Sequence, residues 1–554
     1  MSNSAVPASD QFPYGLVPGV IIVDCDRMYL FMIEEIIQYN HRRYFVGCDV
    51  GTSSTKSCVM DEMGNVLGSK SIEYKLYTPH PSWAEHNPED YWNAAADTMK
   101  LAIQKANIDP ALIRGVSISA LSPSCILVDK DLNPLQYGHI WMDRRGVKQS
   151  LWLKEHIGDQ RVQQVSANPI DPYYGTVKLM WERDNRPELY KKAYKMQTAA
   201  DYPAMKLTGR AVTDYANASL IGIAFDMETR SWDTAMLEEI GLDPDKFPEP
   251  FACDEIIGEV TGEAAERTGL KKGTPVFAGG VDCNMAYLAN GAIEDGDWVV
   301  TMGTAGCMGV ISNSNHYPKN LINIPASNNS RNAFAAVGAT IACGSCTRYF
   351  RDTFAQYEHA FSRDIGLNVY DVMNLEAASV PAGSEGLLIL PYFSGERTPI
   401  WDPNARTVIF GMSLNHTRGH LLRALMEGAA LALYDNYTFM KDAGIKMKEP
   451  LFASEGGAQS PLWRQIVADI FGVPVAYQKT TRGAPEGNCI MIGVKTGVFK
   501  DYSIVKDWVQ VDNVSEPNMK NHALYMELFN IYKNVYRGVS SQYAPLADIV
   551  NRGL

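Results

Sequence analysis

The sequence lacks the two glycine-rich fingerprints of the commonest nucleotide-binding folds. Its 554 residues contain neither GxxxxGK[S/T] nor a GxGxxG that opens a helix after a strand. Those patterns build the P-loop and the dinucleotide-binding turn. Any phosphate site in this chain must therefore be built in another way.

Positive charge is also in short supply. The chain has 50 Lys and Arg against 63 Asp and Glu, a formal net charge of -13. A nucleic-acid surface needs a basic patch that neutralises phosphates, so this balance argues against a nucleic-acid partner. An acidic protein can still bind phosphates locally, with the help of a metal.

Long apolar runs are missing near the start of the chain. Two short apolar runs, 20–23 and 28–33, are separated and followed by charged residues. This pattern is neither the uninterrupted core of a signal peptide nor a membrane span. We expect no membrane partner, and we interpret residues 1–43 as an extension outside the catalytic core.

Paired metal-binding cysteine motifs are absent too. The ten cysteines are scattered, and most stand beside apolar residues, which indicates small buried side chains in a reducing, cytoplasmic compartment. The one CxxC, Cys343 to Cys346, has no second pair and no nearby histidine. We expect it to be part of a packed helix start rather than a zinc or redox site.

The length then sets the organisation. A chain of 554 residues with 46% hydrophobic and 20% charged residues has the composition of a globular protein and is too long for one core. We expect two or more domains.

The most informative segment that is present is Gly47 to Lys56, GCDVGTSSTK. Strand-forming residues 44–46 run into it and residues 56–60 resume an extended pattern, which predicts a hairpin. The carboxylate of Asp49 is suited to Mg²⁺, and the glycine allows a close approach of the backbone to a ligand. The alternative is an ordinary polar hairpin. The groups that would face a phosphate belong to Gly51, Thr52, Ser53 and Ser54.

The rest of the chain predicts two similar α/β halves. In the first, three strands precede a helix whose start is signalled by Asn87 and Pro88, and further strands follow. The second half repeats this order loosely, and two such units imply a cleft between them. The expected strands are 44–50, 56–60, 66–76, 115–121, 125–128, 298–302, 307–311 and 450–454, and the later helices are 421–434 and 461–471.

An acid follows a double glycine in Gly279 to Asn284, GGVDCN. The apolar run 275–278 before it predicts a strand, which would expose Asp282 at the strand's carboxyl end. There the carboxylate could take the proton of a substrate hydroxyl. The alternative is that Asp282 caps a helix beginning at Asn284.

Seven motifs follow one another along the chain. They are GCDVGTSSTK, PHPSWAEHNPEDYW (79–92), GGVDCN, TMGTAG (301–306), FSGERTPIWDP (393–403), FGMSLNHTRGHLLRALMEG (410–428) and SEGGAQSPLWRQIVADIFGVPV (454–475). Taken in order, they resemble the FGGY family of carbohydrate kinases over roughly residues 44–536. The resemblance implies an α/β fold of two ribonuclease-H-like (actin-like ATPase) domains with an interdomain catalytic cleft. It places the sugar and metal side in 44–292, the nucleotide side in 293–540 and a tail in 541–554.

The resemblance also implies roles for single residues. Asp282 matches the general base, and together with Asp49 it is the expected Mg²⁺ site. Lys178 matches a lysine near the substrate mouth, for which a surface lysine at a helix start is the alternative. The residues expected around ATP are Thr52, Ser53 and Ser54 on one side, Gly303 and Thr304 at the β and γ phosphates, and Gly456, Gly457 and Ala458 at adenine and ribose.

The expected substrate is a small sugar, and its identity is less defined. The motifs look most similar to xylulokinase and related pentulose kinases, but the substrate loop 118–125, ISALSPSC, lacks the Gly-Gln-Met-His-Gly run of xylulokinases and the Arg-Glu pair of glycerol kinases. Ser122 replaces a larger polar group. In IWMDRR, Trp141 would stack on the sugar, and Asp143 would accept hydrogen bonds from the sugar hydroxyls. The alternative is that Trp141 belongs to the core and that Asp143 pairs with Arg144 or Arg145 to hold the loop.

The sequence thus predicts ATP- and Mg²⁺-dependent phosphorylation of a primary hydroxyl of a ketose, such as xylulose. The alternatives are another polyol or ketose of the ribulose, glycerol or erythritol type, or a non-catalytic sugar-binding protein of the same fold. The segment 484–493, APEGNCIMIG, departs from the family pattern at Asn488 and Cys489, which we interpret as repacking. Many family members are dimers, so a homodimer is open.

Overall fold

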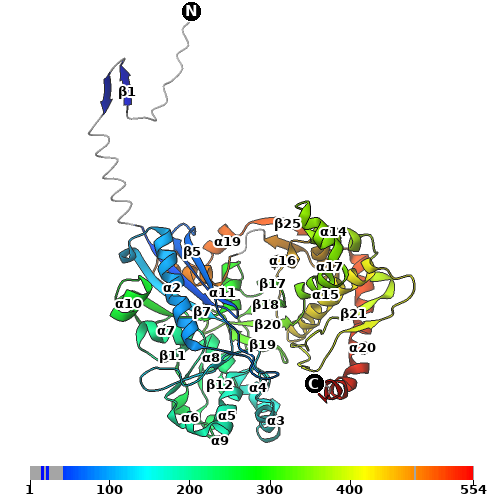
Figure 1. Cartoon of the computed structure of the whole chain (residues 1–554), viewed down its shortest axis with the longest axis horizontal. Helices are drawn as coiled ribbons and strands as arrows, with labels where there is room; N and C mark the ends of the chain where they lie inside the picture. Colours follow the sequence, from blue (N-terminus) through cyan, green and yellow to red (C-terminus); the bar gives the residue numbers. More distant parts are fainter. Residues whose placement is uncertain (1–13, 18–19, 24–41, 479–481, 553–554) are drawn as a thin grey trace, which may run out of the picture.

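In the computed structural model, two mixed β-sheets lie side by side, and helices cover both (Figure 1). The structure describes residues 14–17, 20–23, 42–478 and 482–552. Most of the predicted extension, 1–43, lies outside the described residues; within it β1 (Tyr14–Val17) pairs with β2 (Val20–Val23). No helix in the described ranges is long and apolar enough to cross a membrane.

The first sheet has the strand order β15-β16-β7-β3-β4-β5. Strands β3 and β4 are antiparallel and joined by the turn 51–53, which confirms the predicted hairpin. Strands β7 and β16 extend the sheet in parallel with β3. The bounds are β3 (Tyr44–Val50), β4 (Ser54–Asp61), β5 (Val66–Glu73), β7 (Ile113–Ala120), β15 (Ile256–Glu259) and β16 (Pro275–Val281).

The second sheet repeats this pattern, with the order β19-β20-β18-β17-β23-β24-β25. Here β17, β18 and β20 form the antiparallel part, and β23 and β24 continue in parallel with β17. The two sheets therefore carry the repeated unit predicted from the sequence. The bounds are β17 (Trp298–Met302), β18 (Gly306–Ser312), β19 (Ile322–Pro325), β20 (Phe334–Thr340), β23 (Leu451–Ser454), β24 (Val475–Gln478) and β25 (Val511–Ser515).

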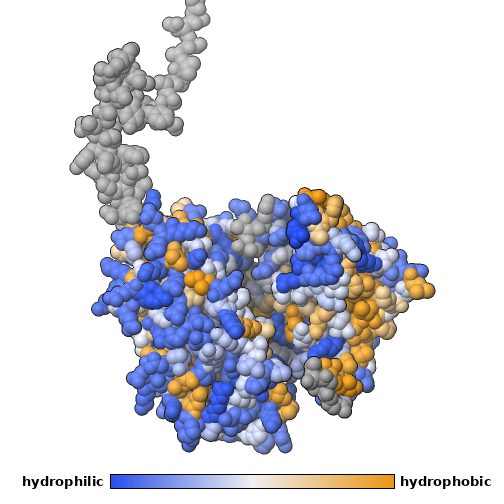
Figure 2. Space-filling model, in the orientation of Figure 1, coloured by the Kyte–Doolittle hydropathy of each residue, from blue (hydrophilic) through white to orange (hydrophobic). Residues whose placement is uncertain are grey.

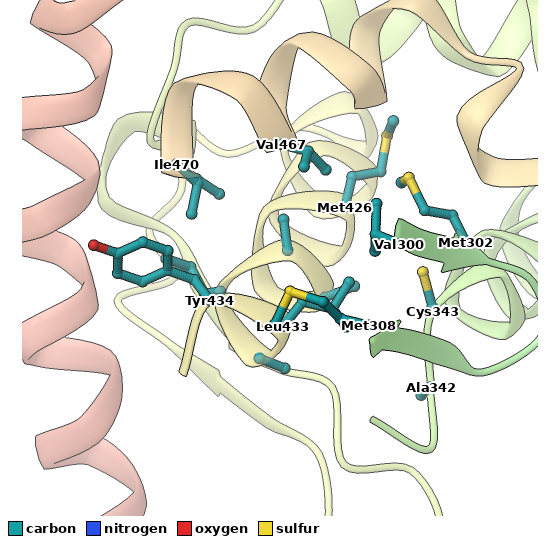
Figure 3. Close-up of a cluster of buried hydrophobic side chains, with 14 of the residues drawn as sticks. Val300, Met302, Met308, Ala342, Cys343, Met426, Leu433, Tyr434, Val467 and Ile470 are labelled. Atoms are coloured by element: carbon teal, nitrogen blue, oxygen red, sulfur yellow. The ribbon is translucent and has the colours of Figure 1, made fainter. Parts of the chain in front are cut away.

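The main covering helices arise from apolar residues at helical spacing. Helix α2 (Pro88–Ala106) packs on β4 and β5, and its start is capped by Asn87, whose side chain accepts a hydrogen bond from the Glu89 amide. In the second half, α15 (Arg418–Asp442) and α17 (Pro461–Phe471) enclose a core with β17 and β18 (Figure 3). Cys343 and Cys346 are buried in this core, as predicted.

One helix crosses between the halves. Helix α18 (Ala484–Lys495) belongs to the late part of the sequence but packs on β3, β7 and α11 (Asp282–Ala289) of the first half (Figure 1). At Gly47 of β3, a β-carbon would lie 1.8 Å from the Pro485 carbonyl oxygen, so only glycine allows this contact. The division into 44–292 and 293–540 stays a prediction, and α18 shows that the second range also supplies packing for the first sheet.

The remaining elements connect and cover these sheets. In the first half they are β6 (Glu85–His86), η1 (Pro110–Leu112), β8 (Ile126–Val128), β9 (Gly138–His139), α3 (Val147–His156), α4 (Asp159–Ser166), α5 (Gly175–Asn185), α6 (Pro187–Lys192), β10 (Lys195–Gln197), α7 (Asp201–Thr208), β11 (Val212–Asp214), α8 (Tyr215–Ile221), β12 (Phe225–Asp226), β13 (Ser231–Trp232), α9 (Thr234–Glu239), η2 (Pro244–Lys246), β14 (Glu249–Phe251) and α10 (Gly262–Thr268). In the second half they are α12 (Gly344–Phe354), α13 (Gln356–Asp364), α14 (Val369–Ala378), η3 (Ser384–Gly386), β21 (Leu388–Leu390), β22 (Val408–Phe410), α16 (Glu455–Ala458), α19 (Ile504–Trp508) and α20 (Met519–Arg552). Helix α20 runs through 541–552, most of the range predicted as a tail.

Candidate active site

Three parallel strands of the first sheet end at one edge, and this edge gathers the predicted acids. Asp49 of β3 pairs with Ser119 of β7, and Ser119 pairs with Gly280 of β16. Asp282 follows two residues later, as the first residue of α11. Ligands of open α/β sheets bind at such carboxyl ends, so the register places the predicted metal ligand and the predicted base together.

The pKa values of both carboxylates are raised. Burial, and then the charge of Asp282, raise the pKa of Asp49 to about 8, although Ser119 Oγ donates a hydrogen bond of 2.7 Å to it. Burial raises the pKa of Asp282 to about 6, and the Cys283 amide donates a hydrogen bond of 2.6 Å to its carboxylate. The N-cap of α11 is Val281, so the alternative role of Asp282, capping a helix from Asn284, is wrong.

This carboxylate pair fits the predicted Mg²⁺. Among the described residues no group of three or more metal-ligating side chains exists, but Mg²⁺ is usually held by one or two carboxylates together with substrate phosphates and water. Two acids lie at one edge, and the charge of Asp282 is one of the causes that raise the pKa of Asp49. Such a pair has the donor chemistry that a divalent cation needs. Asp49 and Asp282 are the residues that would hold it.

The glycine turns of the second half also meet at one sheet edge. Thr301 of β17 pairs with Ser454 of β23, which brings the turn after β17 beside α16. A β-carbon at Gly457 would lie 2.9 Å from the Met302 carbonyl oxygen, whereas one at Gly456 would meet nothing within 4 Å. The space beside Gly456 is therefore free for a ligand, and the buried Ala458 lies beneath it.

Two hydrogen bonds from α12 hold the turn after β17. The amide of Gly344, at the start of α12, donates a hydrogen bond of 2.7 Å to the Gly303 carbonyl, and Arg348 Nη2 donates one of 2.9 Å to Thr304 Oγ1. Thr304 and Arg348 are both exposed. The structure therefore adds a cation, Arg348, beside the predicted phosphate turn.

The turn after β3 is closed by a similar backbone contact. The Gly51 amide donates to the Ser54 carbonyl at 2.9 Å, and Thr52 Oγ1 accepts a hydrogen bond of 3.1 Å from Trp141 Nε1. Ser53 is exposed, and Trp141 is only partly buried. Trp141 thus reaches the edge where the acids lie, as a substrate contact would require.

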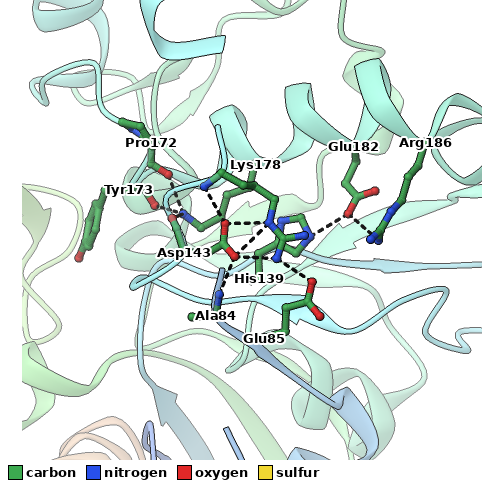
Figure 4. Close-up of polar contacts among 10 residues, drawn as sticks. Ala84, Glu85, His139, Asp143, Pro172, Tyr173, Lys178, Glu182 and Arg186 are labelled. Carbon is green, nitrogen blue, oxygen red and sulfur yellow. Dashed lines mark hydrogen bonds and ion pairs between the residues drawn. The ribbon is translucent and has the colours of Figure 1, made fainter. Parts of the chain in front are cut away.

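Two predicted substrate residues instead belong to a buried polar network (Figure 4). The Asp143 carboxylate is fully buried and accepts hydrogen bonds from the Ala84 amide and from the backbone and guanidinium of Arg145. Lys178 Nζ, also fully buried, donates to the carbonyls of Asp143, Pro172 and Tyr173 at 3.3, 2.8 and 2.6 Å. The prediction that both contact the substrate is corrected, because their polar atoms are already used to hold two loops.

Ser122 is different, because its hydroxyl is buried and has no hydrogen-bond partner within the described ranges. Its carbonyl accepts a hydrogen bond of 3.0 Å from Tyr173 Oη. By contrast, Ser124 Oγ is occupied by the Ala199 amide at 2.7 Å. An unsatisfied buried hydroxyl is costly, so Ser122 is suited to a hydroxyl-rich ligand.

Sequence reasoning missed several groups around this edge. Asn488 of α18 donates hydrogen bonds of 2.9 Å to Ser119 Oγ and 3.1 Å to the Cys48 carbonyl, and so supports the group that orients Asp49. The departure from the family pattern at Asn488 is the sequence signal for this contact, although in the sequence alone it indicates only repacking. For Ser119, Tyr173 and Arg348 the signal is weaker, since strand register and loop contacts decide their positions.

Residues of the two halves also line a common pocket. Its volume is about 760 Å³, and both halves line it, with Gln163 and Asp171 on one side and Lys319 and Trp401 on the other. The rings of Tyr173 and Trp401 are 6.1 Å apart, which connects the pocket to Ser122. Figure 2 shows the surface hollowed between the two halves.

Two domain models of one known protein family match most of the chain. The N-terminal domain of the FGGY family of carbohydrate kinases matches residues 44–289, and its C-terminal domain matches residues 298–495. The chain belongs to the FGGY family of carbohydrate kinases. It is therefore a phosphotransferase with the two-domain fold of that family, as the motifs predicted.

Individual FGGY kinases resemble the chain over their full length. A xylulose kinase of Staphylococcus epidermidis is 29% identical, with 94% of this chain and 100% of that protein covered. A gluconokinase of Bacillus licheniformis is 30% identical, with 91% and 98% covered. The crystal structure of xylulose kinase from Rhodospirillum rubrum superposes with a TM-score of 0.83 at 27% identity, with 91% of this chain and 100% of that chain covered.

An Asp49→Asn variant of this FGGY kinase tests the crowding of the two acids. Because the folded-state pKa values, about 8 and about 6, exceed the ordinary value of 3.8, the folded protein binds these protons more tightly than the unfolded chain. The resulting stability is fully present below pH 4 and is lost as the pH rises through 6 and 8. Without Mg²⁺ at pH 8 we expect the variant to melt at least about 1 °C higher than the wild type.

Scanning calorimetry between pH 4 and pH 8 measures this difference, which should shrink as the pH falls. Added MgCl₂ should raise the melting temperature of the wild type more than that of the variant. A variant that melts below the wild type at pH 8 without metal would show that the carboxylates are not in conflict.

Proposed function

We propose that the protein transfers the γ-phosphoryl group of MgATP to a primary hydroxyl of a ketose, and that the preferred acceptor is a pentulose such as xylulose. The observation that carries the proposal is the register Asp49–Ser119–Gly280, which brings Asp49 and Asp282 to one edge of the first sheet. The full-length similarity to xylulose kinases supports the choice of acceptor.

In this proposal Asp282 takes the proton of the acceptor hydroxyl. Its pKa of about 6 leaves it ionised at neutral pH while it keeps a useful affinity for a proton. Mg²⁺, held between Asp49, Asp282 and the phosphates, would neutralise charge on the transferred group. Gly303, Thr304 and Arg348 position the phosphates from the second half, and approach of the two halves excludes water.

The acceptor would bind beside Ser122 and Trp141. The Ser122 hydroxyl has no hydrogen-bond partner in the part of the chain that the structure describes, and the indole of Trp141 presents an apolar face of the kind that packs on sugar C–H groups. Neither group is the large polar residue that the related pentulose kinases carry in this loop. Recognition is therefore expected to use the pocket side chains beyond the loop.

A second candidate acceptor is an aldonate such as gluconate. The chain is 30% identical to the gluconokinase of Bacillus licheniformis and 29% identical to the xylulose kinase of Staphylococcus epidermidis. Arg397, which forms no ion pair among the described residues, lies near Trp141. Polyols of the glycerol or erythritol type are not favoured by any single contact.

The experiment is a coupled assay of ADP release with ketopentoses, ketohexoses, polyols and gluconate as acceptors. We expect one acceptor, xylulose, to give the highest kcat/KM. No acceptor raising ADP release above the rate without sugar would overturn the proposal. Calorimetric binding of a sugar without any product would point instead to a non-catalytic sugar-binding member of the fold.

A cytosolic location belongs to the same proposal. All nine cysteines of the described residues are free thiols, which agrees with a reducing compartment. A homodimer stays a prediction from the family resemblance.

A further inference from the structure

Arg397 is an arginine whose guanidinium forms no ion pair among the described residues, although its charge opposes the rise that burial causes in the pKa of the adjacent Glu396. No hydrogen bond or ion pair of its side chain is found among the described residues, and its buried Nε has no partner. The guanidinium lies over the Trp141 ring, 5.3 Å from the ring centre. A guanidinium has five donors and no acceptor, so leaving the buried Nε without a partner is costly unless a ligand supplies an acceptor.

The backbone around Arg397 is held rigidly. On one side, the buried Glu396 carboxylate accepts hydrogen bonds from Thr340 Oγ1 at 2.6 Å, from the Ile341 amide at 2.9 Å and from the Arg397 amide at 2.7 Å. On the other side, Thr398 Oγ1 donates to the Ala339 carbonyl at 3.0 Å and accepts from the Ala339 amide at 2.5 Å. Both neighbours of Arg397 are thus fixed to the end of β20, and only the Arg397 side chain is left free.

The surroundings of the guanidinium belong to the acceptor side of the cleft. Trp141 donates to Thr52 in the turn after β3. Burial raises the pKa of both Tyr173 and Cys307, and the charge of Arg397 opposes that rise, as expected for a cation close to both; Asp282 acts on the same two groups. Arg397, from the second half, therefore faces residues of the first half across the place where the hydroxyl is to be phosphorylated.

We propose that Arg397 binds an oxyanion at the acceptor side of the cleft. The fixed loop and the free fork of donors suit a planar or tetrahedral oxyanion, which arginine binds through two parallel hydrogen bonds. Two sources of this chemistry exist: the phosphoryl group as it reaches the acceptor, or the carboxylate of an aldonate acceptor. The inference rests on the proposed function only in placing the acceptor beside Asp282.

The test compares Arg397→Gln and Arg397→Lys with wild type, using xylulose and gluconate as acceptors. If the oxyanion is the phosphoryl group, Arg397→Gln lowers kcat for every acceptor that the wild type uses, by about 10²–10³-fold, and lysine restores part of it. If the oxyanion is the carboxylate, Arg397→Gln raises KM for gluconate by about 10-fold or more and leaves xylulose unchanged. Rates within about threefold of wild type for both acceptors would overturn the proposal, since either role is expected to contribute far more than that.

Calorimetric titration without ATP gives a readout that does not depend on turnover. Xylulose 5-phosphate and gluconate are titrated into wild type and Arg397→Gln; weaker binding of one of them by the variant supports the proposal, and equal binding of both contradicts it. This arm separates the two failures, because a protein without kinase activity can still show the arginine-dependent binding. Arg406→Gln, in the same loop but bonded to the Pro403 and Ala405 carbonyls, is the matched control and should behave as wild type.

Discussion

Replacing Asp282 with asparagine is expected to lower kcat by about 10²–10⁴-fold, the usual contribution of a general base. The amide keeps the size of the side chain and can still accept the hydrogen bond that the Cys283 amide donates, but it cannot take a proton from the acceptor hydroxyl. Because α16 and the turn after β17 lie on the second sheet, ATP should still bind. Single-turnover kinetics measure the loss, and fluorescence titration with a labelled ATP analogue measures binding.

The control for this experiment is Asp131→Asn. Asp131 is an exposed acid in the turn after β8, a strand that pairs with β10 and not with the large sheet that carries Asp49, so its replacement should leave kcat unchanged. Activity of Asp282→Asn within tenfold of wild type would remove Asp282 from the role of base. A variant that loses ATP binding together with activity would show instead that Asp282 acts mainly through the metal.

The elements of this site that the sequence predicted are those set by local patterns. The strands on each side of Gly47–Lys56, the position of Asp282 directly after a strand, and the start of α2 at Asn87 follow from alternation, glycine placement and capping within about ten residues. The repeated unit in the second half followed for the same reason. The order of the motifs along the chain then indicates a single protein family.

Asp143 and Lys178 were predicted as substrate contacts, but near neighbours such as Arg145 and Tyr173, together with the distant Ala84 amide, already use their hydrogen-bonding groups. Lys178 Nζ is surrounded by carbonyls of 143, 172 and 173, and Asp143 faces Arg145 and the Ala84 amide. A polar residue in a motif looks the same in sequence whether it faces a ligand or closes a loop. Only tertiary contacts reveal that its hydrogen-bonding capacity is already filled.

The position of α18 was equally out of reach. Asn488 contacts Cys48 and Ser119, which lie 440 and 369 residues away in the sequence. No periodicity in α18 distinguishes packing on the first sheet from packing on the second. The glycines of α18 indicate that another backbone packs closely against this helix, but the sequence does not identify which one.

Gly487→Ala is expected to be strongly damaging for that reason. An added methyl group at 487 would lie 2.1 Å from the Met285 carbonyl oxygen and 2.8 Å from its carbonyl carbon, and backbone atoms cannot move aside as a flexible side chain would. Helix propensity alone would favour alanine by up to about 1 kcal/mol. Forced overpacking typically costs about 1–3 kcal/mol, so the packing term should decide the sign and lower the melting temperature.

The same substitution should reduce activity beyond its effect on stability. Met285 lies in α11, three residues after Asp282, so a helix pushed away from α18 carries the base with it. A misplacement of about 1 Å can cost about 10²-fold in rate. Thermal melts and kcat, measured at a temperature where both proteins are folded, separate the loss of stability from the displacement of the base.

Gly538→Ala is the matched control for Gly487→Ala. Gly538 is also inside a helix, α20, but it is exposed and a β-carbon there would meet nothing within 4 Å. Helix propensity then acts unopposed, and the variant should melt at or above the wild-type temperature with an unchanged kcat. If Gly487→Ala matched Gly538→Ala in both measurements, α18 and α11 would not be in the close contact that holds Asp282 at the strand edge.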